Sequence, residues 1–220
     1  MSDASGTDAH DSHAVILASA SPRRSALLTQ IGVKHRIVPA DLDETRLAGE
    51  TAADCVQRLA LAKARQVWQA VVLGADGAVV VCADDAVVLG ADTAVVLGDD
   101  MLGKPRDRTD GLAMLARLSG RSHRVLSAVA VVADGRAAVV LSDSEVRFRP
   151  LQAGEIAAYW DSGEPRDKAG AYAIQGLGAV FIAGLSGSYS GVMGLPLFET
   201  AQLLHAAGVR IGTRPPPDAV

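Results

Sequence analysis

The residues best suited to chemistry are charged side chains that stand beside small residues in apolar sequence. Asp92 and Thr93 follow Gly90-Ala91, and Lys104 comes later between Gly103 and Pro105. The β-rich surroundings predict that Asp92 lies at a strand end, a favourable place for a functional carboxylate. A turn over 98–100 would bring the chain back and place Lys104 near Asp92. The alternative is a structural salt bridge beside a hairpin.

A second group of side chains suits anion binding. Ser21, Arg23 and Arg24 stand where a short strand gives way to a helix that begins at Ser21-Pro22. The N-terminus of a helix offers unpaired N–H groups and partial positive charge to an anion. The forked donors of arginine match phosphate oxygens. By itself, however, this pattern favours an ordinary capped helix with solvated arginines, since cations in a first turn oppose the helix dipole.

A lysine and an acidic loop add to this inventory. Lys63 falls on the apolar stripe of a helix predicted over about 51–70, so it either snorkels outward or reaches into a polar cleft. The loop over 41–44 ends in Glu44. With Asp92, Glu44 could form an oxygen-only site for a hard cation such as Mg²⁺. The alternative is that the loop is merely solvated.

A charged, glycine-containing segment over 163–176 is typical of an ordered binding loop, although a solvated loop is the alternative. It contains Lys168 and ends in Gln175-Gly176 after an apolar run. This order predicts an amide at the edge of a buried strand, where a nucleobase edge could satisfy its hydrogen bonds. Cations for phosphates, carboxylates for a metal and an amide for a base together suit metal-dependent nucleotide hydrolysis.

The elements that would position these residues alternate between strands and helices. Strands are predicted over 14–18, 35–39, 78–82, 86–91 and 94–97, and a hairpin over 124–132 and 137–148 turns at Asp134-Gly135. Helices are predicted from Ser21-Pro22 to Gly32, over 51 to about 70, and over 108–118, 155–160 and 195–207. This alternation predicts an α/β or α+β fold. We expect one domain over 14–208, between a disordered tail over 1–13 and a flexible tail over 209–220.

Composition excludes several classes of protein. The 220 residues are 49% apolar and 21% charged, which excludes a disordered or fibrous chain. A net charge of −4 and only 4% aromatic residues argue against stable nucleic-acid binding. The two cysteines and five histidines show no metal-ligand spacing. No signal peptide or bilayer-spanning run is present, so we expect a cytoplasmic protein with no membrane partner. Monomer and homodimer both stay open.

Taken in order, the motifs resemble the Maf nucleotide pyrophosphatases, also called septum formation inhibitor proteins. The resemblance extends from Ile16 to about Leu204. It is carried by residues 17–24, 43–44, 58–64, 90–93, 102–105, 118–120, 167–172, 175–176 and 194–197. It implies an elongated mixed α/β fold with flanking helices and a cleft between two lobes, similar to inosine triphosphate pyrophosphatases. It also implies hydrolysis of nucleoside triphosphates to the monophosphate and pyrophosphate with Mg²⁺ or Mn²⁺.

The resemblance further implies roles for individual residues. Asp92 would be the proton acceptor, in preference to Asp76, which stands in a near-repeat of the same sequence over 71–80. Glu44 would assist with the metal or the water. The cations Arg24, Lys63 and Lys104 would hold the triphosphate.

Substrate choice is implied by three further positions of the family. Arg23, Thr93 and Gln175 match positions that separate subfamilies, and these residue types look like the dTTP/UTP branch. The segment over 72–86 is longer than is usual for the family, which leaves the local strand order open. A family-level use would be the clearing of non-standard nucleotides. Two alternatives stay open: a 7-methyl-GTP pyrophosphatase, and a non-enzymatic regulator of cell division.

Overall fold

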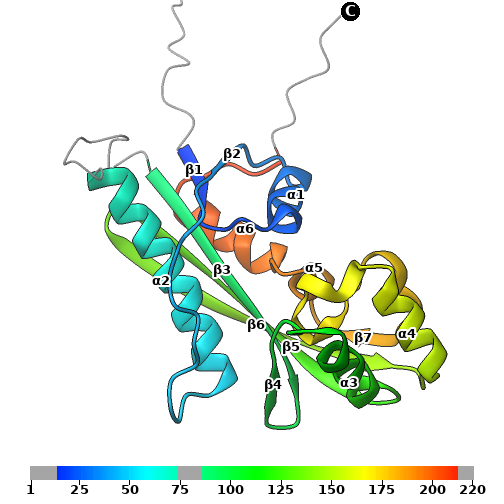
Figure 1. Cartoon of the computed structure of the whole chain (residues 1–220). Coiled ribbons are helices and arrows are strands. Elements are labelled where there is room, and N and C mark those ends of the chain that lie inside the picture. Colours follow the sequence, from blue (N-terminus) through cyan, green and yellow to red (C-terminus); the bar gives the residue numbers. More distant parts are fainter. Residues whose placement is uncertain (1–13, 74–85, 213–220) are drawn as a thin grey trace, which may run out of the picture.

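The computed structural model describes residues 14–73 and 86–212. The tail over 1–13, the expected strand over 78–82, Asp76 and residues 213–220 lie outside the described residues. Within them the chain forms a mixed α/β fold, in which helices flank a seven-stranded sheet (Figure 1). The fold class expected from the sequence is thereby confirmed.

The sheet combines parallel and antiparallel strands. Its order is β2-β1-β3-β5-β6-β7, and β4 pairs with β3 outside this path. Strand β1 runs parallel to β2 and β3, and every other pair is antiparallel. The strands are β1 (Ala14–Leu17), β2 (His35–Ile37), β3 (Ala86–Leu97), β4 (Asp100–Leu102), β5 (Ser122–Ala133), β6 (Arg136–Phe148) and β7 (Ile182–Ser186).

Apart from α5, the α-helices of the described residues begin and end close to the positions that the sequence predicts. They are α1 (Pro22–Gln30), α2 (Ala52–Leu73), α3 (Arg108–Leu118), α4 (Ala153–Asp161), α5 (Tyr189–Val192) and α6 (Leu197–Ala206). Within the described residues, 3₁₀ helices lie between α4 and β7: η2 (Glu164–Asp167), η3 (Ala169–Ala171) and η4 (Gly176–Phe181). The sequence did not predict these three helices, nor α5, β4 and β7. Helix α2 begins at a capping contact, in which the Thr51 hydroxyl accepts a hydrogen bond from the Asp54 N–H at 3.1 Å.

The start of α1 differs in detail from the expected cap. Ser21 occupies the N-cap position, but its side chain makes no capping hydrogen bond. Instead, the Ser19 hydroxyl accepts the Ser21 N–H at 3.2 Å, and Pro22 begins the helix with its preset backbone angle.

Strand β3 corrects another expectation. The sequence predicted two strands, over 86–91 and 94–97, with Asp92 at a strand end. The structure has one strand over Ala86–Leu97, and Asp92 lies in its middle, opposite Ala128 of β5. The pairing of β3 with β5 continues through Asp92. The buried carboxylate is tolerated there because it forms an ion pair with Lys63 of α2. The expected turn over 98–100 is confirmed by the β3–β4 pairing.

Strand β3 runs through two lobes, one that contains α1 and α6 and one that contains α3 and α4 (Figure 1). Helix α2 packs against the face of β3 opposite these helices. Successive side chains of a strand point to opposite faces. Val88 and Val96 pack with α2 on one face. On the other face, Leu89 packs with α1 and α6, whereas Leu97 packs with α3 and α4. Two separate apolar cores therefore pack against one face of β3, and Thr93 lies on that face between them.

No helix within the described residues combines the length and the apolar content needed to cross a membrane.

Candidate active site

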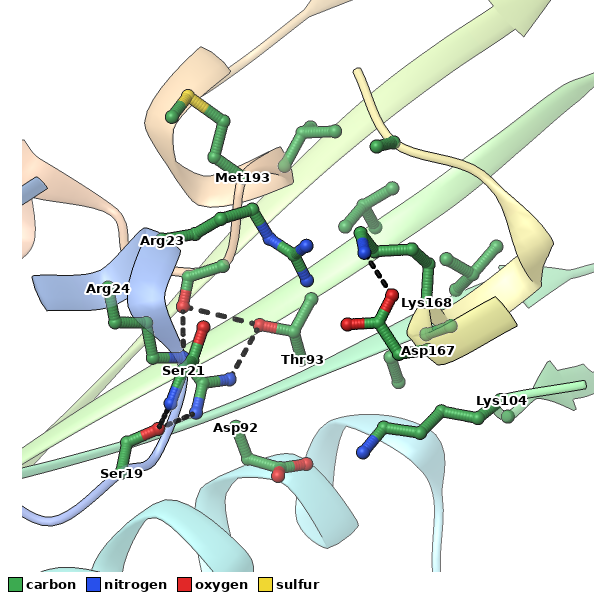
Figure 2. Close-up of a pocket in the computed structure, with 18 of the residues that line it drawn as sticks. Ser19, Ser21, Arg23, Arg24, Asp92, Thr93, Lys104, Asp167, Lys168 and Met193 are labelled. Carbon is green, nitrogen blue, oxygen red and sulfur yellow. Dashed lines mark hydrogen bonds and ion pairs between the residues drawn. The ribbon is translucent and has the colours of Figure 1, made fainter. Parts of the chain in front are cut away.

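A cleft of about 590 Å³ lies between the two lobes, over the middle of β3 (Figure 2). Volumes of this size accommodate small-molecule ligands. The structure places in this one cleft every residue that the sequence singled out as a site residue. They are Ser21, Arg23, Arg24, Glu44, Lys63, Asp92, Thr93, Lys104, Lys168 and Gln175.

Lys63 of α2 contacts two carboxylates at the floor of the cleft. Its Nζ lies 2.7 Å from Asp92 Oδ1 and 2.5 Å from Glu44 Oε1. Gly90 makes this approach possible: a Cβ there would lie 2.2 Å from the backbone oxygen of Ala60, so α2 packs directly against β3. The lysine on the apolar stripe therefore reaches into a polar cleft and does not snorkel outward. Asp92 forms its ion pair with Lys63, and Lys104, which the sequence placed near Asp92, lines the same cleft.

Glu44 lies on a loop that α2 holds on both sides. Gln66 Nε2 donates a hydrogen bond to the backbone oxygen of Asp41 at 2.6 Å. Arg58 Nη2 donates to the backbone oxygen of Thr45 at 3.2 Å. Since these ties flank Glu44 on either side, a loop without helix or strand still presents its carboxylate to Lys63.

The two carboxylates differ in their electrostatics. Burial raises the pKa of the Asp92 carboxyl, and Lys63 only partly opposes this rise. Burial acts in the same direction on Glu44, but there the hydrogen bond and charge of Lys63 prevail and lower its pKa. The difference follows exposure, since the Glu44 side chain is 56% exposed and that of Asp92 is 11% exposed. Carboxylates whose pKa values move apart are suited to different roles.

Arg24 ties β3 to the segment that precedes α6. Its Nε donates to the backbone oxygen of Gly194 at 2.9 Å, and Nη1 donates to that of Ala91 at 2.8 Å. Nη1 also donates to Ser19 Oγ at 3.1 Å, and Nη2 donates to Thr93 Oγ1 at 3.4 Å. Burial lowers the pKa of Arg24, and the nearby carboxylates oppose this. Most of its donors are thus committed to the protein, a framework task that the sequence did not indicate.

Thr93 points to the face of β3 opposite Asp92, toward the gap between the two apolar cores. Its hydroxyl lies 2.9 Å from Ser127 Oγ of β5, and Ser127 in turn donates to the backbone oxygen of Gly191 at 2.6 Å. This chain of hydrogen bonds connects the sheet to α5, and it holds Thr93 in a fixed orientation at the cleft.

Three cations reach the cleft from different elements. Arg23 extends from α1 toward Thr93 and Lys168, and Lys104 comes from the segment after β4 (Figure 2). Within residues 14–73 and 86–212, neither Arg23 nor Lys104 forms an ion pair. Lys168 pairs with its neighbour Asp167. Sequence reasoning missed Asp167, because nothing in a charged loop distinguishes a cleft carboxylate from a solvated one.

Gln175 corrects the expectation of an amide at the edge of a buried strand. The residue is exposed, follows no strand, and occupies the N-cap position of η4 with extended backbone. Before it, Tyr172 and Ile174 are buried as expected, but they belong to a loop and not to a strand. Gln175 still lines the cleft, and because it is exposed there, its amide is accessible to a ligand.

Comparison with known proteins defines the class. A family model described as Maf-like protein matches residues 14–207, and the chain belongs to this family. It is 50% identical over 204 residues to a protein named dTTP/UTP pyrophosphatase from Hahella chejuensis (strain KCTC 2396), covering 90% of this chain and 94% of that protein. A protein of the same name from Pseudoalteromonas atlantica is 49% identical over 198 residues, covering 86% and 95%. A third such protein, from Bordetella parapertussis, is 48% identical over 224 residues, covering 96% and 100%.

Proposed function

We propose that this chain hydrolyses nucleoside triphosphates, with dTTP and UTP preferred, to the nucleoside monophosphate and pyrophosphate. The observation that carries the proposal is the arrangement of Asp92, Lys63 and Glu44 on the floor of a cleft whose walls present further cations. The relatives named dTTP/UTP pyrophosphatase support the same substrate class.

In the proposed reaction, a water molecule attacks the α-phosphorus and pyrophosphate departs. Asp92 accepts the proton of that water. Its raised pKa makes the ionised carboxylate a stronger base than an ordinary aspartate, and the contact with Lys63 favours that ionised form. Lys104 and Lys168 stabilise the negative charge that develops on the departing pyrophosphate. Gln175, Thr93 and Arg23 select the base and orient the nucleotide.

The donors on the floor of the cleft fit a divalent cation. Glu44 Oε1 and Asp92 Oδ1 both contact the ammonium group of Lys63, at 2.5 and 2.7 Å, so the two carboxylates lie close together and the second oxygen of each would be the one to take a cation. Mg²⁺ takes one or two protein carboxylates and completes its shell with waters and substrate phosphates. Asp92 and Glu44 would hold Mg²⁺ or Mn²⁺ in this way. When bound, such a cation neutralises phosphate charge and makes a nearby water a stronger nucleophile.

The test is hydrolysis of a nucleotide panel in ¹⁸O-labelled water with Mg²⁺. We expect pyrophosphate release, with UTP and dTTP consumed faster than 7-methyl-GTP and the label recovered in the monophosphate. Asp92→Asn should abolish turnover, whereas Asp143→Asn on the exposed side of β6 should leave it unchanged. Faster turnover of 7-methyl-GTP would support the other pyrophosphatase branch. A cell-division effect that survives Asp92→Asn, with no turnover in the wild type, would support a non-enzymatic regulator.

A further inference from the structure

The segment that carries Gln175 has no ladder of strand hydrogen bonds, yet it must hold an exposed amide in one place. Residues 172–175 form neither helix nor strand, and η4 follows directly. A free backbone here would cost binding affinity, because the ligand would have to order it. The geometry of this segment must therefore come from side chains around it.

One carboxylate supplies that geometry. Glu164 Oε2 accepts the Leu177 N–H at 2.8 Å, and Glu164 Oε1 accepts the Gly178 N–H at 3.0 Å. Oε1 also accepts the hydroxyl of Tyr159 at 2.8 Å. The Tyr159 oxygen in turn accepts the Ala173 N–H at 3.1 Å. The backbone is thus tied on both sides of Gln175 to a single carboxylate–phenol pair.

The glycines of the segment leave room for this pair. A Cβ at Gly176 would lie 2.4 Å from Glu164 Oε2, and a Cβ at Gly178 would lie 2.7 Å from the Tyr159 hydroxyl. Gly176 also has a φ of +79°, a conformation that favours glycine. The close approach and the hydrogen bonds are separate observations, and both place Glu164 and Tyr159 directly against the loop.

Glu164 is ionised in this setting. Burial opposes its charge, but the two backbone N–H groups and the Tyr159 hydroxyl prevail and lower its pKa. Within the described residues Glu164 forms no ion pair, and its carboxylate accepts hydrogen bonds from the loop and from Tyr159 instead. Glu164 also begins η2, which ends at Asp167 next to Lys168. Glu164 is therefore connected to Lys168 through η2 and to the segment that carries Gln175 through its hydrogen bonds.

We propose that Glu164 and Tyr159 are positioning residues for base selection, which hold the backbone around Gln175 so that its amide meets the nucleobase edge. The proposal rests on the function proposed above. Neither side chain needs to touch the substrate. Loosening the segment should weaken discrimination between bases, while the chemistry at Asp92 continues.

Glu164→Gln in the full chain tests this, with the ratio of kcat/KM for UTP to that for 7-methyl-GTP as the readout. The variant places an N–H₂ group against N–H donors, and lost hydrogen bonds to a charged group of this kind correspond to about a tenfold fall in the ratio. We expect kcat for UTP to change much less. Tyr159→Phe should lower the ratio too, and the two changes combined should be less than additive because they disrupt one network.

The matched control is Glu155→Gln, which removes a carboxylate from α4 that pairs with Arg149 at 2.6 Å and does not line the cleft. It should lower stability without changing the ratio. An unchanged ratio in Glu164→Gln, or an equal loss for every base, would overturn the positioning role. Hydrogen exchange at the Leu177 and Gly178 amides, which should accelerate in Glu164→Gln, tests the tie independently of turnover. A wild type that hydrolyses no nucleotide defeats the proposed function, and unaltered exchange at these amides defeats the tie itself.

Discussion

At the scale of single residues, the site depends on one lysine that serves two carboxylates in different surroundings. Lys63 reaches Asp92 in the interior and Glu44 near the surface. The same ammonium group therefore limits a raised pKa at Asp92 and produces a lowered pKa at Glu44. Charge on Lys63 is worth more to Asp92, because screening by water is weaker around a buried pair.

Lys63→Met should move the pH dependence of the proposed hydrolysis as well as slow it. Lys63 lowers the pKa of Asp92, so its removal raises that pKa further, and the acidic limb of kcat/KM should shift to higher pH. The rate at the optimum should fall by about a hundredfold or more, as for loss of a charge-stabilising donor. A pH series of initial rates measures both effects. Lys34→Met, away from the cleft, is the control, and an unshifted limb would contradict the coupling.

His123 should make stability depend on pH independently of the site. It is 3% exposed, and burial lowers its pKa from 6.5 to about 4. Between these values the unfolded chain binds the proton and the folded chain does not, so the free energy of unfolding rises with pH across this window. The contribution of His123 is at most about 3 kcal/mol, present above pH 6.5 and lost by pH 4.

Urea unfolding at several pH values measures this dependence. His123→Gln keeps a polar group for the Tyr172 hydroxyl, which lies 2.8 Å from His123 Nε2. The variant should show a shallower slope of stability against pH between 4 and 6.5 than the wild type. Equal slopes in the two proteins would assign the acid sensitivity to other groups.

At the scale of elements, the sequence predicted the positions of most helices and strands, but it divided β3 into two strands where the structure has one. A polar Asp-Thr pair inside a run of valines resembles a strand end, because unpaired carboxylates are costly within a sheet. The structure removes that cost by bringing Lys63 from α2, a contact between distant parts of the chain that local sequence cannot reveal. By contrast, the boundaries of α3 follow from local signals, and they match the prediction.

Gly90→Ala should show how closely α2 must approach β3. An added Cβ would lie 2.2 Å from the Ala60 oxygen and 2.7 Å from the Ala64 nitrogen, so the helix must move. We expect a loss of about 2 kcal/mol or more in the free energy of unfolding, as for overpacked cores. The rate should also fall, because the Lys63–Asp92 contact lengthens.

Gly154→Ala in α4 is the matched control for this change. A Cβ there meets no atom within 4 Å, and alanine favours a helix. Chemical denaturation and initial rates on the two variants decide the matter: a stable, fully active Gly90→Ala protein would mean that α2 and β3 tolerate a wider separation.

At the scale of the whole molecule, the ordered series of motifs predicted that distant residues meet in one cleft, and they do. What could not be predicted is the irregular region over 163–186. Its elements are short 3₁₀ helices and the strand β7, and glycine residues such as Gly163 and Gly176 adopt positive φ there. Such segments lack the periodicity from which elements are inferred. Their conformation depends on side chains such as Glu164, whose partners are known only once the chain has folded.

The two lobes share β3, so they should unfold as one cooperative unit, and a ligand in the cleft should stabilise both. A non-hydrolysable UTP analogue with a methylene bridge between the α- and β-phosphorus, present with Mg²⁺ at a hundred times its Kd, should raise Tm by about 5–10 °C. Differential scanning calorimetry measures the shift in Tm and the number of transitions.

Lys104→Ala should reduce the shift in Tm, because this lysine reaches the cleft without an ion-pair partner in the described chain. Arg136→Ala, at the distant β5–β6 turn, should preserve the shift. Two transitions, with only one displaced by the analogue, would mean that the lobes fold separately and that the ligand binds one of them alone.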